Sequence, residues 1–117
     1  MNIVVYGAGA IGGYLGGRLA LAGHRVTLVT RPAAAEALSA AGLHITQDGV
    51  TEIAPLRAVG RLADAFDGPP PELIVLSMKA YDLAAAVADL RAVYPESATL
   101  LTTQNGIGVE EIVAAPF

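Results

Sequence analysis

The residues best suited to bind a ligand are the glycines that follow the first apolar run of the chain. The sequence GAGAIG, residues 7–12, stands between NIVVY and a stretch with helical spacing. In such a strand–turn–helix unit, the first glycine of G-x-G-x-x-G makes a tight turn and the second lets a pyrophosphate approach the backbone. The third lets helix and strand pack closely, and N–H groups at the helix N-terminus bind the phosphates. The pattern predicts a dinucleotide site formed by Gly7, Ala8, Gly9, Ala10, Ile11 and Gly12.

Three more glycines extend this segment beyond the fingerprint. We interpret Gly16 and Gly17 as positions of close packing, because a glycine inside a helix costs roughly 1 kcal/mol relative to alanine and needs a reason. For Gly13, packing and a place near the cofactor are equally open. A glycine-rich turn can also serve only to let the chain turn tightly, with no ligand bound. Its place between a strand and a helix favours the dinucleotide site.

The residue that ends the second predicted strand indicates which dinucleotide binds. NAD-binding folds usually place Asp or Glu there, about 20 residues after the glycines, to accept hydrogen bonds from the ribose 2′-hydroxyl. Here the strand ends Val29-Thr30-Arg31, and the next carboxylate is Glu36. An arginine binds a 2′-phosphate through charge-assisted hydrogen bonds, so Arg31 favours NADP over NAD. The alternative is an ordinary solvated surface arginine.

Polar side chains also follow two later predicted strands. Lys79 comes after ELIVLSM, and Asn105 comes after ATLLTT. Alone, a lysine after a strand is usually just exposed, and an Asn-Gly pair is usually just a turn. The glycine loop, Arg31, Lys79 and Asn105 nevertheless follow four successive strands of one predicted parallel sheet, and such sheets bind ligands at that carboxyl edge. Their shared position strengthens the prediction of a single binding site.

The elements that must position these residues alternate between strand and helix. The predicted strands are residues 2–6, 25–30, 72–78 and 98–103; the predicted helices are residues 10–22, 33–41 and 82–93, with another beginning at VEEIVAA. Asp48-Gly49 between two alternating segments predicts a small antiparallel hairpin. The order predicts an α/β fold with a doubly wound, Rossmann-type, mostly parallel sheet and a small β-hairpin excursion.

Local spacing also predicts details of two helices. The apolar face of the first helix is expected at Ile11, Leu15, Leu19 and Ala22, with Gly23 left-handed at its end. The helix over residues 82–93 is expected to begin with Asp82 as its N-cap.

Composition excludes several classes of function. The 117 residues have a net charge of −4, so the basic surface that nucleic acids require is missing, and we expect no DNA or RNA partner. There is no cysteine, which excludes disulfides and thiolate metal sites, and His24 and His44 are too scattered to predict a metal site. No apolar run is long enough to span a bilayer, so we expect no membrane partner and a cytoplasmic location.

At these residues the chain resembles a known family. GAGAIGGYLG after the first strand, an arginine closing the second, KAYD and QNGIGVEE are similar to the N-terminal half of the ketopantoate reductases, the 2-dehydropantoate 2-reductase family. The resemblance implies NADPH-dependent reduction of 2-dehydropantoate to pantoate, in pantothenate and coenzyme A biosynthesis. It implies that residues 7–12 bind the pyrophosphate, Arg31 the 2′-phosphate and Lys79 the cofactor. Asn105 would lie at the nicotinamide end and also contact the substrate.

The resemblance covers essentially the whole chain but only part of the family's architecture. Members continue into a helical C-terminal domain with the catalytic lysine, and no counterpart of it is present. We therefore expect residues 1–117 to form an NADP-binding Rossmann domain that contains no catalytic residue and is inactive alone. Tyr81 and Gln104 receive no role. A related NADP-dependent 2-oxo acid reductase of unknown substrate and a stand-alone dinucleotide-binding module are the alternatives; the substrate and the oligomeric state stay open.

Overall fold

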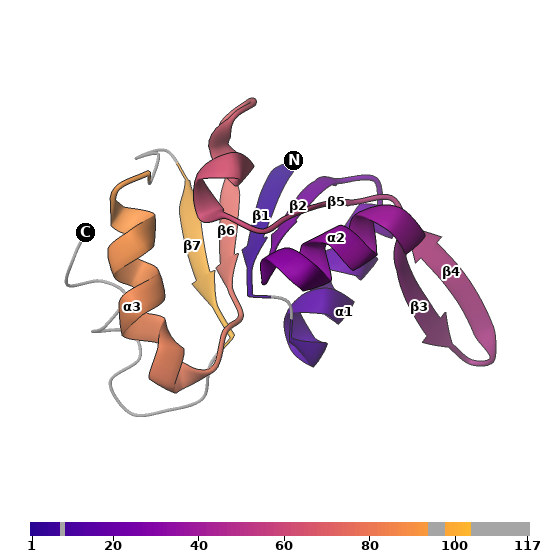
Figure 1. The fold of residues 1–117 in the computed structure, drawn as a ribbon. Helices are drawn as coiled ribbons and strands as arrows, with labels where there is room; N and C mark the ends of the chain where they lie inside the picture. The colour runs from indigo at the N-terminus through magenta and orange to yellow at the C-terminus, as the bar shows by residue number, and fades with distance from the viewer. Residues whose placement is uncertain (8, 94–97, 104–117) are drawn as a thin grey trace.

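The computed structural model describes residues 1–7, 9–93 and 98–103. Within these residues the central feature is a five-stranded parallel sheet with the order β5-β2-β1-β6-β7 (Figure 1). The strands are β1 (Asn2–Tyr6), β2 (Arg25–Val29), β5 (Arg57–Val59), β6 (Leu73–Leu76) and β7 (Thr99–Thr102). The helices are α1 (Ala10–Leu21), α2 (Pro32–Ala41), α3 (Ala80–Arg91) and the 3₁₀ helix η1 (Leu62–Phe66).

Side chains of β1 alternate between two apolar cores, one on each face of the sheet. Val4 packs into the core that contains Leu83 of α3, whereas Ile3 and Val5 pack with Ala20 of α1. In Figure 1, α3 lies on one side of the sheet and α1 and α2 lie on the other. A strand buried on both faces needs a continuous apolar sequence, which NIVVY supplies. The predicted doubly wound arrangement is confirmed.

The predicted hairpin is also confirmed. β3 (Leu43–Gln47) and β4 (Val50–Ala54) pair in antiparallel fashion, apart from the main sheet. Asp48 has φ 52° and Gly49 has φ 78°, the two left-handed values that the favoured two-residue hairpin turn requires. The hairpin packs onto α1 through the buried Ile45.

The structure adds β5 and η1, which the sequence patterns do not predict. β5 pairs in parallel with β2, with Val59 beside Val29, and so forms one edge of the sheet among the described strands. Three residues are too few for an alternating pattern to be recognised. The strands that precede the predicted site residues remain neighbours, because β2, β1, β6 and β7 are consecutive in the sheet.

The predicted apolar face of α1 is confirmed only in part, because Leu15 and Leu19 pack against the core and the other two residues do not. Ile11 is 62% exposed and Ala22 is exposed, while Leu15 and Leu19 are only partly buried. The buried residues of the helix are Gly12, Gly16, Gly17 and Ala20. Helix α1 lies so close to its neighbours that the positions facing them have no room for large side chains.

Helix α3 begins at Ala80, so the predicted N-cap is wrong. Lys79 is the N-cap, with φ −64° and ψ 150°, and Asp82 lies in the first turn. The N–H of Asp82 donates to the Lys79 carbonyl oxygen at 2.9 Å. An acidic side chain in the first turn interacts favourably with the helix dipole, which explains why the residue type suits this end of the helix.

Candidate dinucleotide site

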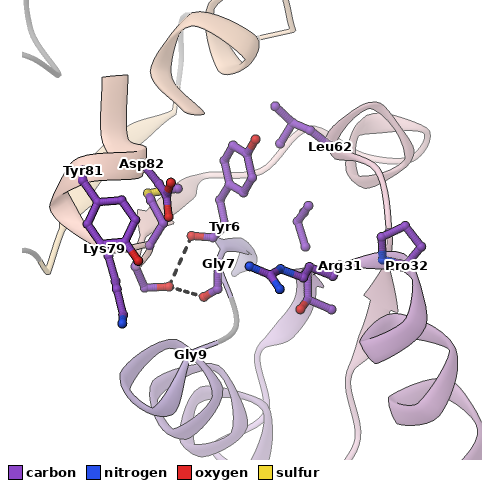
Figure 2. A pocket seen from close by; sticks show the side chains of 14 residues that line it. Tyr6, Gly7, Gly9, Arg31, Pro32, Leu62, Lys79, Tyr81 and Asp82 are labelled. Atoms are coloured by element: carbon purple, nitrogen blue, oxygen red, sulfur yellow. Dashed lines mark hydrogen bonds between the residues drawn. The ribbon is translucent and has the colours of Figure 1, made fainter. Parts of the chain in front are cut away.

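A cleft of about 640 Å³ lies where β1, β2 and β6 end at their carboxyl edge. Four of the predicted cofactor-binding residues line it: Gly7, Gly9, Arg31 and Lys79. In Figure 2, Arg31 and Pro32 lie on one side of the cleft, Lys79 and Tyr81 on the other, with Gly7 between them. Three connections that are distant in sequence thus meet at one place, as the parallel topology requires.

Gly7 makes the tight turn at the end of β1. Its φ is 101°, a conformation that side chains rarely adopt, and its N–H donates to the Val29 carbonyl oxygen at 2.9 Å. A Cβ at this position would lie 2.7 Å from the backbone nitrogen of Met78. Glycine is therefore required here both by the backbone angle and by the close approach of the chain after β6.

Ser77 holds the same turn from the other side, and the sequence analysis misses it. Its hydroxyl donates to the Gly7 carbonyl oxygen and lies 3.2 Å from the Tyr6 carbonyl oxygen (dashed lines, Figure 2). A Cβ on Gly12 would overlap both the Gly7 oxygen and the Ser77 hydroxyl. Ser77 is the first residue after β6. The predicted strand extends to residue 78 and therefore contains Ser77, so the edge argument that selected Lys79 does not reach it.

Gly9 and Gly13 face open space. A Cβ built on either residue would meet no atom of the described chain within 4 Å. Gly9 is the N-cap of α1 with an extended backbone, φ −69° and ψ −173°, and no side chain caps the helix. Neither packing nor backbone angle requires glycine at position 9, which leaves the approach of a ligand as the reason predicted for it. For Gly13 the structure gives no packing reason either, and a place near the cofactor stays a prediction.

Gly16 and Gly17 do pack closely, as interpreted from the sequence. A Cβ on Gly17 would overlap the Ile45 side chain and lie 3.1 Å from Leu43, both in the hairpin. A Cβ on Gly16 would be 3.4 Å from Val5.

The remaining predicted residues fall elsewhere. Ala10 and Ile11 are exposed on the first turn of α1 and do not line the cleft. Ala8 and Asn105 lie outside the described residues, as do Gln104 and the predicted helix after it.

Three helix N-termini meet at this cleft. Gly9, Arg31 and Lys79 are the N-caps of α1, α2 and α3, and none of these helices has a side-chain hydrogen bond at its cap. Each N-terminus bears a partial positive charge and unpaired N–H donors. The guanidinium of Arg31 and the ammonium of Lys79 add two full charges, against one carboxylate, Asp82, in the lining. This arrangement can attract an anion that has several charged groups.

Two aromatic residues line the cleft as well. The Lys79 ammonium lies 5.9 Å from the centre of the Tyr81 ring, and Tyr81 is 78% exposed. Tyr6 is half-buried; this burial, with a smaller effect of the Asp89 charge, raises the pKa of its hydroxyl above the usual value of 10.

The motifs and the fold match one protein family. The family model described as "Ketopantoate reductase PanE/ApbA" matches residues 3–117. The chain belongs to the ketopantoate reductase family. The resemblance inferred from the glycine loop, KAYD and QNGIGVEE is confirmed, and the chain is part of an oxidoreductase family with a Rossmann-type sheet.

Relatives with known names or structures agree with this family. A 2-dehydropantoate 2-reductase from Mesorhizobium japonicum is 38% identical over 92% of the chain, which covers 32% of that protein. The crystal structure of a PanE/ApbA family ketopantoate reductase from Ralstonia eutropha superposes with a TM-score of 0.89 at 31% identity. That match covers 98% of this chain and 38% of the other. The chain therefore spans about a third of the length of these ketopantoate reductases.

One structural neighbour bears a different name. A D-mandelate dehydrogenase, in a ternary structure with NADH and anilino(oxo)acetate, superposes with a TM-score of 0.84 at 28% identity. The match covers 98% of this chain and 37% of that one.

Among the described residues, no helix has the length and apolar character needed to cross a membrane. The same part of the chain contains no group of three or more His, Asp or Glu side chains arranged to bind a metal ion.

Proposed function

We propose that residues 1–117 form the NADPH-binding domain of a reductase that acts on 2-dehydropantoate. The observation that supports this most is the convergence of three helix N-termini with Arg31 and Lys79 on one cleft. NADPH has a pyrophosphate and a separate 2′-phosphate, so it offers anionic groups to more than one of these positions.

Each residue has a distinct task in this proposal. The N–H groups at the start of α1 bind the pyrophosphate, which reaches the backbone because Gly9 has no side chain. Arg31 donates charge-assisted hydrogen bonds to the 2′-phosphate, and Lys79 binds the cofactor from the opposite wall. Asn105 contacts the nicotinamide end and the substrate. When bound, the cofactor supplies the hydride for the reduction of a ketone.

The substrate is proposed from relatives. Three proteins named 2-dehydropantoate 2-reductase are 37% to 38% identical to the chain. Because the chain also matches the structure of a D-mandelate dehydrogenase, the second candidate for the substrate is a different 2-oxo acid. Because that dehydrogenase structure contains NADH, NAD is the alternative to NADP as the cofactor of this chain. Pantothenate biosynthesis and a cytoplasmic location are part of the proposal for the first candidate.

The proposal is tested by calorimetric titration of the chain with NADPH and with NADH. We expect NADPH to bind more tightly, because NADH has no 2′-phosphate for Arg31. Equal affinities, or tighter binding of NADH, would contradict the NADP assignment. Failure of both to bind would contradict the dinucleotide site itself.

A further inference from the structure

Ser77 has an arrangement that the proposed function does not use. Its backbone N–H donates to the Tyr6 carbonyl oxygen at 2.9 Å, in continuation of the β1–β6 ladder. The Ser77 hydroxyl lies within reach of the carbonyl oxygens of both Tyr6 and Gly7, and the Gly7 oxygen is the nearer. Because a hydroxyl has a single proton, we assign that proton to the Gly7 carbonyl oxygen.

The two hydrogen-bonding groups of Gly7 are thus both paired, on opposite sides of β1. The N–H of Gly7 bonds to Val29 at the end of β2, and its carbonyl oxygen bonds to Ser77 after β6. The turn is fixed to both neighbouring strands at the point where the chain enters the glycine loop. The conformation of Gly7, φ 101°, is therefore held by two hydrogen bonds rather than by the residue type alone.

The third glycine of the fingerprint provides the room for this hydrogen bond. A Cβ on Gly12 would overlap the Gly7 carbonyl oxygen and the Ser77 hydroxyl, the two atoms that the bond joins. Gly12 is buried on the face of α1 toward β6. The Ser77–Gly7 hydrogen bond can form because Gly12 has no side chain.

We propose that Ser77 is a positioning residue for the dinucleotide. By holding the Gly7 carbonyl oxygen, it fixes the loop in the conformation that presents the N-terminus of α1 to the pyrophosphate, without touching the ligand itself. This inference rests on the proposed function. It predicts that Ser77 affects recognition of the pyrophosphate and leaves recognition of the 2′-phosphate at Arg31 unchanged.

The experiment compares Ser77→Ala and Arg31→Ala with three ligands followed by NMR titration. NADPH has both anionic groups, adenosine diphosphate has only the diphosphate, and adenosine 2′-monophosphate has only the 2′-phosphate. Loss of one hydrogen bond that organises the loop is expected to weaken NADPH and adenosine diphosphate about tenfold in Ser77→Ala. Binding of adenosine 2′-monophosphate should stay unchanged there. Arg31→Ala should show the reverse selectivity for the two fragments.

A matched pair separates the hydroxyl from the shape of the side chain. Ser77→Thr keeps the hydroxyl, whereas Ser77→Val has nearly the same shape without it. We expect the Thr variant to bind NADPH as the unmodified chain does and the Val variant to resemble Ser77→Ala. This pair also decides the question if Ser77→Ala does not fold.

The outcomes that overturn the inference are distinct from those that overturn the proposed function. If the unmodified chain binds NADPH and Ser77→Ala or Ser77→Val binds it equally well, Ser77 is not a positioning residue. Equal weakening of the two fragments in these variants indicates general destabilisation and also refutes it. If the unmodified chain binds none of the three ligands, the dinucleotide site is refuted.

Discussion

Gly17 of α1 lies directly against Ile45 of β3, and the helix and the hairpin approach this closely because position 17 has no side chain. Gly17→Ala would drive a methyl group into the Ile45 side chain in a buried region. Overpacking of this kind costs about 1–3 kcal/mol, which exceeds the gain in helix propensity. We expect a lower free energy of unfolding, measured by urea denaturation.

Two further variants make this test specific. Gly13→Ala on the same helix meets no described atom and should raise the free energy of unfolding by roughly 0.5–1 kcal/mol. Ile45→Val removes the overlapping methyl group, so its usual cost of about 0.5–1.5 kcal/mol should shrink in the Gly17→Ala background. Strictly additive effects of the two substitutions would show that the contact is not the cause.

Gly9→Val is expected to abolish NADPH binding without affecting the fold. The backbone of Gly9 is extended, which valine adopts readily, and no described atom lies within 4 Å of its Cβ position. The branched side chain would instead occupy the space in which the pyrophosphate approaches. Circular dichroism and calorimetric titration measure the two properties separately. A folded variant with normal affinity would assign Gly9 no part in binding.

Arg31→Ala is expected to narrow the difference in affinity between NADPH and NADH. Removal of a charge-assisted contact to the 2′-phosphate should weaken NADPH binding by about 1.5–3 kcal/mol and leave NADH binding nearly unchanged. Arg91→Ala, in the last turn of α3, provides the control for the loss of one positive charge outside the cleft. An equal effect of both substitutions would mean that Arg31 acts only through the net charge.

Tyr6 is expected to ionise above pH 10 when the protein is folded. Burial raises the pKa of its hydroxyl relative to the unfolded chain, so the folded state holds this proton more tightly. The resulting stability is present below pH 10 and is lost as the pH rises through the folded-state pKa. Tyr6→Phe should lessen this loss and remove a late component from the absorbance titration, whereas Tyr81→Phe serves as the control. If Tyr6→Phe removes a component from the middle of the titration rather than from its high-pH end, the raised pKa is contradicted.

Residues 1–117 are expected to bind NADPH but not to reduce 2-dehydropantoate. Hydride transfer to a ketone leaves negative charge on oxygen, which a positioned acid must neutralise. Lys79, the only lysine of the sequence, is proposed to bind the cofactor. The absorbance of the nicotinamide band should therefore stay constant when 2-dehydropantoate is added. Turnover that disappears in Lys79→Ala or Tyr81→Phe would identify the acid in this chain and overturn the expectation.

The sequence predicts the elements of this fold better than the contacts between them. Asp48-Gly49 and the apolar run at β1 are local signals, and the hairpin and the buried strand both form as predicted. The buried face of α1 depends instead on how close β3 comes, which the spacing of Ile11 and Leu15 does not reveal. For the same reason, local propensity selects Asp82 as a cap although the helix begins before it.

Some residues of the candidate site can likewise be predicted from local sequence, and others only from the contacts in the fold. Gly7, Arg31 and Lys79 are predictable because each follows a strand, and parallel strands bring their ends to one edge. Ser77 escapes notice because serine has no strong motif, and its role depends on a carbonyl oxygen seventy positions earlier. The requirement for Gly12 likewise becomes visible only through the atoms that would collide with its Cβ.

The strand order also determines when this site can form during synthesis on the ribosome. β1 is made first, yet Ile3 pairs with Leu73, so one edge of β1 stays open until β6 has been translated. Closure of so long a loop is entropically costly, and exposed apolar strands favour aggregation of the nascent chain. Nascent chains that end before β6 should therefore depend on chaperones and bind no nucleotide, because the glycine loop lacks its attachment to Ser77.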